Sequence, residues 1–303
     1  MKLLILGKDG QVGTELARAS AAKGLDHRAL GRAEADFAHP ETLAAVVRGS
    51  GADVVVNCAA YTAVDQAESE TALAFKVNRD GPEALARACA ETGAALVHFS
   101  TDYVFDGAKD SPYEEADPTS PLSVYGRSKE AGERAVRTRH HRHVILRTSW
   151  VYAAHGRNFL RTMLRLGAER DELKVVDDQR GAPTSAVDLA GAALAVAERL
   201  HAGRSDRVLP PYGTYHCTAE GETTWRGFAD EIFAEVRRHA GRAPRIVPIT
   251  TAQYPTPAAR PRNSVLDNSR LVAAFGLPRT DWRRGVAEAV GSLLAPAGTK
   301  GRS

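Results

Sequence analysis

The fold of this chain is decided by residues 3–13, LLILGKDGQVG. An apolar run of one strand length meets Gly7, and Gly10 and Gly13 follow at the start of a stretch with helical spacing. A strand that ends in such a turn and opens a helix lets backbone N–H groups and the helix dipole face a diphosphate. We therefore expect a dinucleotide to bind at this turn, although the spacing is Gly-x-x-Gly-x-x-Gly rather than Gly-x-Gly-x-x-Gly.

The alternation of strand and helix continues to about residue 150. The predicted strands are apolar almost throughout, so both faces of the sheet must be covered. This pattern predicts an α/β fold, a Rossmann-type doubly wound parallel sheet. The predicted elements are strands at 3–6, 53–57, 95–99 and 143–147, and helices at 12–23, 72–92 and 125–138.

The regular alternation weakens in the second half of the chain. Short strands such as 174–176, a helix at 225–239 and a Pro-rich passage at 254–261 predict a smaller α/β lobe. We expect an NAD(P)-binding domain over 1–150, whose core continues with segments beyond 150. We expect a C-terminal substrate-binding lobe, interleaved with that core, over most of 151–303.

Composition and charge exclude several classes of protein. The net charge of +3 comes from 40 basic and 37 acidic residues, which favours neither nucleic acid nor a membrane surface as partner. The three cysteines and the isolated histidines have no metal-ligand spacing, so we predict no metal site. The apolar start is too short for a signal peptide or a membrane span, and we expect a cytoplasmic protein.

Three residues have the chemistry of carbonyl reduction. Tyr125 and Lys129 are four apart on a predicted helix, so both project from one face. A nearby ammonium lowers the pKa of a phenol and makes it a usable acid near neutral pH. Thr101, just after the predicted strand 95–99, supplies a second hydrogen-bond donor for the oxygen that becomes an alkoxide. We predict Tyr125, Lys129 and Thr101 as the catalytic group.

The choice of cofactor depends on the residues after the second strand. Arg32 stands where an arginine accommodates a 2′-phosphate, which favours NADPH. Glu34 opposes that preference, and a surface role for Arg32 is an equal alternative. The prediction is NADPH, with NADH left open.

Six further motifs extend the pattern over nearly the whole chain. In order, the sequence contains VNCAAYTAVD at 56–65, FSTDYVFDG at 99–107, YGRSK at 125–129 and RTSWVY at 147–152, followed by DQRGAPT at 178–184 and RPRNS at 260–264. Together with GKDGQVG at 7–13 they resemble the dTDP-4-dehydrorhamnose reductases of the extended short-chain dehydrogenase/reductase superfamily.

The resemblance implies reduction of the 4-keto group of a dTDP-4-dehydro-6-deoxy-L-sugar to dTDP-L-rhamnose. Tyr125 would be the proton donor, and Lys129 would hold the nicotinamide ribose and tune the phenol. The substrate would contact Thr101, Asp102, Trp150, Arg262 and Asn263. The cofactor site would comprise Gly7, Gly10, Gln11, Val12, Gly13, Arg32, Asp36, Phe37, Ala60, Tyr61, Thr62, Phe99, Tyr125 and Lys129.

Two alternative functions and the oligomeric state stay open. The same motifs suit a reductase of another dTDP-4-keto sugar, such as dTDP-dihydrostreptose synthase in antibiotic biosynthesis, and a non-catalytic NADP-binding regulatory subunit also resembles this family. We expect a monomer or homodimer. Some family members bridge a dimer through glutamates and magnesium, but Val187 stands where a second acid beside Glu15 is needed, so we predict no such bridge.

Overall fold

The structure is a computed structural model that describes residues 1–203 and 211–295. Its larger half is a six-stranded parallel sheet in the order β10-β5-β4-β3-β1-β2. The chain runs from β1 outward to β2 and returns to β3 on the other side of β1, which opens a crevice at the carboxyl ends of these strands. The predicted fold class is confirmed. The strands are β1 (Lys2–Leu6), β2 (Asp26–Leu30), β3 (Val54–Asn57), β4 (Ala95–Thr101), β5 (His143–Thr148) and β10 (Gly213–His216).

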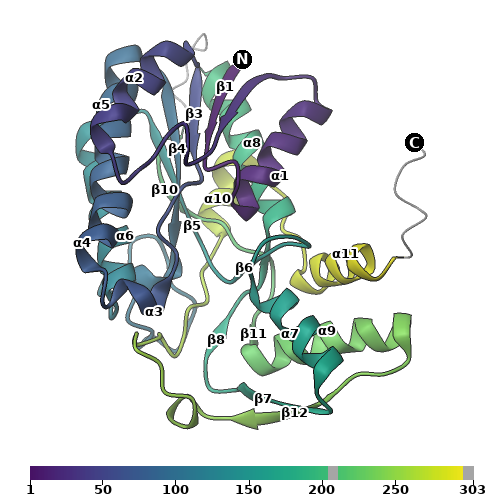
Figure 1. Ribbon diagram of the computed structural model, residues 1–303. Coiled ribbons are helices and arrows are strands. Elements are labelled where there is room, and N and C mark those ends of the chain that lie inside the picture. The colour runs from purple at the N-terminus through teal and green to yellow at the C-terminus, as the bar shows by residue number, and fades with distance from the viewer. Residues whose placement is uncertain (204–210, 296–303) are drawn as a thin grey trace.

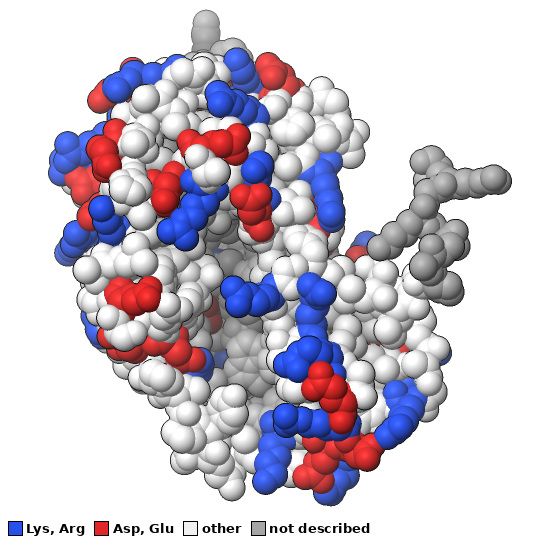
Figure 2. All heavy atoms as spheres, viewed as in Figure 1, with Lys and Arg blue, Asp and Glu red and all other residues white. Residues whose placement is uncertain are grey.

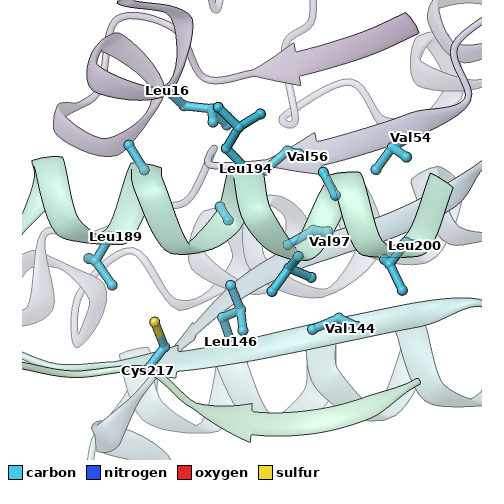
Figure 3. Packing of buried hydrophobic residues seen from close by; sticks show 14 of the residues in the cluster. Leu16, Val54, Val56, Val97, Val144, Leu146, Leu189, Leu194, Leu200 and Cys217 are labelled. Atoms are coloured by element: carbon cyan, nitrogen blue, oxygen red, sulfur yellow. The ribbon is translucent and has the colours of Figure 1, made fainter. Parts of the chain in front are cut away.

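Helices cover both faces of the sheet because side chains alternate along each strand. Leu3 and Ile5 pack with α1 and α8, whereas Leu4 and Leu6 pack on the opposite face with α2, α5 and α6. Figure 3 shows α8 lying across the strands, with Leu194 between Leu16 and the valines of the sheet. The helices of this half are α1 (Gln11–Ala22), α2 (Pro40–Ser50), α3 (Val64–Ala67), α4 (Thr71–Phe75), α5 (Gly81–Thr92), α6 (Val124–Arg139), α8 (Ala186–Ala202) and α10 (Ser269–Phe275).

The single helix predicted over 72–92 is wrong in one respect. A π-helical turn, η1 (Lys76–Asp80), separates α4 from α5. Pro82 explains the break, because proline has no N–H to donate and clashes with the carbonyl four residues earlier. The side chain of Asn78 within this turn binds the backbone of Tyr61 and the hydroxyl of Ser128 on α6. The irregular turn thus ties α6 to the loop after β3.

The smaller half lies beyond the carboxyl ends of the sheet (Figure 1). Its core is aromatic: α7, α9 and α11 pack around Phe228, Trp282 and Tyr152. Its three strand pairs are β6 (Val151–Tyr152) with β9 (Thr184–Ser185), β7 (Glu172–Val176) with β12 (Arg245–Ile249), and β8 (Arg180–Gly181) with β11 (Thr223–Thr224). Its helices are α7 (Phe159–Glu169), α9 (Trp225–Ala240) and α11 (Trp282–Leu294), with a short 3₁₀ turn at Thr251–Gln253. Another 3₁₀ turn, Asp102–Val104, follows β4 in the larger half.

The chain passes between the two halves more than once. Both α8 and β10 come after residue 150, yet α8 covers the sheet and β10 forms its edge. We keep the division into 1–150 and an interleaved lobe over 151–303 as a proposal; residues 204–210 and 296–303 of that lobe lie outside the described residues. Within the described ranges, no helix has the length and apolar character needed to cross a bilayer.

Candidate active site

The glycine turn between β1 and α1 forms a cradle of bare backbone. Gly7 has a φ of +84°, and a Cβ there would lie 2.7 Å from the backbone nitrogen of Ala59. A Cβ on Gly13 would lie 2.1 Å from the carbonyl oxygen of Gly7. Gly10 is the N-cap of α1 and brings no side chain to it, so the free N–H groups of the first turn remain available to an anion. The cradle suits a diphosphate, as the sequence predicts.

A cavity of about 430 Å³ opens from this cradle. The wall includes Tyr61, whose hydroxyl donates to Glu70 at 2.8 Å. Burial and this carboxylate raise the pKa of Tyr61 to about 12. Seven of the predicted cofactor residues line the cavity: Gly7, Gly10, Arg32, Asp36, Phe37, Ala60 and Tyr61. The sequence did not indicate Asp9, Gln66 or Glu70, which lie in the same wall.

The remaining predicted cofactor residues lie at the edges of this region. Gln11 accepts a hydrogen bond from the amide of Asn158 at 2.8 Å, which joins the start of α1 to the loop before α7. The carbonyl of Phe99 accepts from Lys129. Val12 packs against the sheet beneath the cradle. These residues and Thr62 stay predictions as cofactor contacts.

Charged side chains surround the far end of the cavity. Arg32 is 76% exposed and lies 3.5 Å from Asp36. Glu34 accepts from the N–H of Gly31 at 2.9 Å and pairs with Lys8 at 3.3 Å. The N–H of Gly31 and Lys8 hold the pKa of Glu34 below its ordinary value. Basic and acidic side chains therefore both lie at this end of the cavity, and the opposed roles of Arg32 and Glu34 toward the cofactor stay predictions.

The predicted catalytic residues Tyr125 and Lys129 lie on the first turns of α6. Ser123 caps this helix by accepting from the N–H of Gly126 at 3.1 Å. Both side chains are buried, and the ring of Tyr103 packs edge-on against Tyr125 with 5.6 Å between centroids. The ammonium of Lys129 donates to the carbonyl of Phe99 on β4 at 2.7 Å. The helix thus presents the pair at the carboxyl end of β4.

Thr101 ends β4 beside this pair. Its hydroxyl donates to Asp102 at 2.8 Å and accepts from the N–H of Tyr103 at 3.2 Å. Asp102 is 2% exposed, and its second carboxylate oxygen has no hydrogen-bond partner among the described residues. Burial raises the pKa of Asp102 to about 6, and the hydrogen bond from Thr101 opposes the rise. The structure therefore brings Thr101, Asp102 and Tyr125 together at one edge of the sheet.

Burial dominates the electrostatics of the predicted catalytic pair, Tyr125 and Lys129. It lowers the pKa of Lys129 to about 8, and the charge of Glu133 opposes it. It raises the pKa of Tyr125; the hydrogen bond with Thr101 opposes the rise and the charge of Asp102 adds to it. The predicted lowering of the Tyr125 pKa by Lys129 is not what this structure shows, because the ammonium bonds to Phe99 and is itself destabilised by burial.

Trp150 stands at the junction of the two halves. It has a φ of +47°, the only positive value for a non-glycine residue in the described part of the chain. Such a conformation costs about 1–3 kcal/mol and persists where the surroundings hold it. Trp150 stacks on Trp225 with 3.7 Å between centroids, and a Cβ on Gly181 would lie 2.4 Å from its ring. Trp225, which the sequence did not single out, donates to Gln179 at 3.1 Å.

A second cavity, of about 670 Å³, lies in the smaller half. Side chains of α7 and β7 form its apolar wall, and Gln179, Trp225 and Arg260 contribute polar groups. Arg260 also pairs with Asp65 at the start of α3, with 2.9 Å between Nη2 and Oδ2. This pair therefore ties the Pro-rich passage 254–261 to the start of α3.

Two predicted substrate residues, Arg262 and Asn263, differ in exposure and in their hydrogen-bond partners. Arg262 is 64% exposed and pairs with Asp110. Asn263 is buried; its amide donates to the carbonyls of Lys109 and Ser111 at 2.8 and 3.0 Å, so it holds that loop. Substrate contact by Arg262 and Asn263 stays a prediction. Arg260, two residues before Arg262, is the member of this motif that lines the second cavity.

The comparisons with known proteins agree with this geometry. The family model described as RmlD substrate binding domain matches residues 1–294. A dTDP-4-dehydrorhamnose reductase of Burkholderia thailandensis is 51% identical over 300 residues, which cover 97% of this chain and 100% of the relative. This chain belongs to the dTDP-4-dehydrorhamnose reductase family. The family and the oxidoreductase class predicted from the motifs are confirmed.

Solved structures of the dTDP-4-dehydrorhamnose reductase family have the same architecture. The protein from Clostridium acetobutylicum superposes with a TM-score of 0.88 at 38% identity, covering 97% of this chain and 99% of that one. The Bacillus anthracis protein, in complex with NADP, gives 0.86 at 34% identity, covering 95% and 98%. The predicted cofactor class is thus the one that a solved relative binds.

Proposed function

We propose that this chain reduces the 4-keto group of dTDP-4-dehydrorhamnose to give dTDP-L-rhamnose, with NADPH as the reductant. One observation carries the proposal: Thr101, Tyr125 and Lys129 meet at the carboxyl end of β4 in a chain that matches the reductase family over residues 1–294. Relatives of this name, including the one from Burkholderia thailandensis, match it along nearly their full length.

The residues present fit an NADP cofactor. A side chain at Gly7 or Gly13 would fill the cradle, and the 430 Å³ cavity continues from it toward Arg32. The α1 N-terminus would hold the diphosphate, and Arg32 with Lys8 would face a 2′-phosphate against the acids Glu34 and Asp36. When bound, NADPH supplies the hydride.

A side chain of the protein itself donates the proton. As hydride reaches C4 of the sugar, negative charge develops on the C4 oxygen. The Tyr125 hydroxyl donates its proton to that oxygen, so the ketone becomes an alcohol and the phenol becomes a phenolate. Thr101 supplies the second hydrogen bond to the same oxygen. The burial that raises the pKa of Tyr125 keeps the proton on the phenol until the more basic alkoxide forms.

The second cavity suits the nucleotide of the substrate. It is lined by Trp225 and apolar side chains, which match a planar base, and by Arg260, which matches a diphosphate. Figure 2 shows a hollow between the two halves, with lysine and arginine side chains along one rim. The sugar would lie between this cavity and Tyr125, near Trp150.

We also propose a cytoplasmic monomer or homodimer without a magnesium bridge. Glu15 pairs with Arg18 at 3.0 Å, and Val187 is an exposed apolar side chain at the start of α8. In residues 1–203 and 211–295, no group of three or more His, Cys, Asp or Glu side chains is arranged to hold a metal ion.

The first test is turnover by the wild type and Tyr125→Phe. With NADPH and freshly made dTDP-4-dehydrorhamnose, the wild type should oxidise NADPH and form dTDP-L-rhamnose. Tyr125→Phe should lose about 10²-fold or more in kcat while binding NADPH normally, because a general acid is missing. Tyr215→Phe is the matched control: Tyr215 is a buried tyrosine on β10, its hydroxyl donates to the carbonyl of Pro211, and it lies away from the crevice.

The product distinguishes the alternatives. A branched sugar nucleotide in place of dTDP-L-rhamnose would favour dTDP-dihydrostreptose synthesis. Tight NADPH binding without oxidation would overturn the rhamnose assignment; it would favour first a reductase of another dTDP-4-keto sugar and then, if no such sugar is reduced, the regulatory subunit. The names of the curated relatives favour neither of these two alternatives.

A further inference from the structure

A fully buried ion pair joins α6 to β5. Glu133 of α6 accepts from Arg147 of β5 through both carboxylate oxygens, at 2.8 and 2.7 Å. The two side chains are 0% and 3% exposed. The proposed proton transfer uses neither residue. Replacing such a pair by apolar side chains is often neutral or stabilising, so the pair is weak support for stability and a role in the site deserves a test.

The pair is aligned with the catalytic residues along α6. Tyr125, Lys129 and Glu133 follow one another at intervals of four, so they share one face of the helix. Lys129 bonds to the carbonyl of Phe99, and the next residue of β4, Ser100, stands opposite Arg147 in the sheet. Glu133 and Lys129 therefore reach adjacent positions at the same end of the β4–β5 ladder.

Lys129 is surrounded by few other charges. From β4, His98 faces it, but burial and the charge of Lys129 hold the pKa of His98 well below its ordinary value, so this imidazole is neutral at pH 7. From β5, Arg147 is bound to Glu133, as is Arg137 of α6 at 2.9 Å. Asp102 and Tyr125 lie at the end of β4. Burial lowers the pKa of Lys129 to about 8, and the opposing charge is that of Glu133.

We infer that Glu133 is a positioning residue that acts through Lys129: its carboxylate, fixed by Arg147, keeps the Lys129 ammonium charged next to the carbonyl of Phe99. The kinetic consequence of this inference rests on the proposed function. The titration of Lys129 does not depend on that function. Arg147 serves as an anchor, because without it the buried carboxylate would take up a proton and lose the charge that acts on Lys129.

The direct test is the titration of Lys129 by NMR. The sequence has eight lysines, so spectra of protein labelled at the lysine side-chain methylenes should be resolvable, with Lys129→Arg assigning the signal. In Glu133→Gln the midpoint of Lys129 should fall by about one pH unit or more, because the opposite charge on the next turn of the same buried helix face is lost. Glu130→Gln is the control, since Glu130 is partly exposed on the same helix and pairs with Arg137.

A second variant covers the case in which Glu133→Gln does not fold because Arg147 is left unpaired. The double variant Glu133→Gln/Arg147→Met removes both charges together and should fold. The Lys129 midpoint should still fall, but by less than in Glu133→Gln, because the positive charge of Arg147 is removed as well. An unchanged midpoint in whichever of these variants folds would overturn the inference and leave the pair a structural feature only.

Kinetics extend the test to the reaction. In Glu133→Gln the alkaline limb of kcat/KM should move to lower pH by about the same amount, because Lys129 loses its proton earlier. A loss of activity that is equal at all pH values would indicate a structural role. If the wild type does not reduce the sugar nucleotide at all, the proposed function fails, while the NMR titration still decides the role of Glu133.

Discussion

At the scale of the residue, the proposed role of the Thr101 hydroxyl gives a testable prediction. Its hydroxyl contacts Asp102 and the N–H of Tyr103 and interacts with Tyr125. Thr101→Val should lower kcat by about 10²–10³-fold, because one hydrogen-bond donor to the developing alkoxide is lost. Thr101→Ser keeps the hydroxyl and should restore most of the activity. Steady-state kinetics with the sugar nucleotide measure both, and equal kcat for wild type and Thr101→Val would exclude this role.

At the scale of the element, two helical glycines differ in what surrounds them. A Cβ on Gly13 of α1 would lie 2.1 Å from the Gly7 carbonyl oxygen, whereas a Cβ on Gly191 of α8 would meet no atom within 4 Å. Gly13→Ala should therefore destabilise the protein by about 1–3 kcal/mol and weaken NADPH binding about 10-fold or more. Gly191→Ala should stabilise it by about 0.5–1 kcal/mol.

Urea unfolding and NADPH titration measure these two effects. The comparison is informative because both substitutions add one methyl group inside a helix. NADPH binding by Gly13→Ala with the wild-type Kd would show that the cradle does not hold the cofactor.

At the scale of the whole molecule, buried histidines make stability depend on pH. Burial lowers the pKa of His216 to about 3 and that of His140 to about 4, and it also lowers those of His98 and His143. The unfolded chain takes up protons on these side chains as pH falls through about 6.5, while the folded chain does not. Protonation therefore favours unfolding, and stability should fall between about pH 6.5 and 4.

Each buried histidine contributes up to ~1.4 kcal/mol per pH unit to this slope. Asp102 opposes it, since its pKa is raised to about 6 and the folded state binds that proton first. Urea midpoints measured from pH 7 to 4 should fall, and His216→Gln should reduce the slope. His39→Gln, at a 61% exposed side chain, is the control. A midpoint that rises on acidification would contradict the prediction.

The sequence by itself determined the local features of this protein. The glycine turn, the alternation of strand and helix, and the spacing of Tyr125 and Lys129 each depend on residues within a few positions of one another. Turn chemistry and side-chain periodicity are properties of such short segments. These features, with the motifs, were enough to predict the doubly wound sheet and the catalytic edge of β4.

Only the tertiary structure decided which distant residues meet. Arg260 reaches Asp65 across 195 positions of chain, Trp225 stacks on Trp150, and Glu133 binds Arg147. No local pattern encodes these pairs, because they depend on how the smaller half packs against the sheet and on which helix face is buried. The same is true of the electrostatics: spacing predicts that Lys129 lowers the Tyr125 pKa, but burial, which is a property of the whole fold, outweighs it.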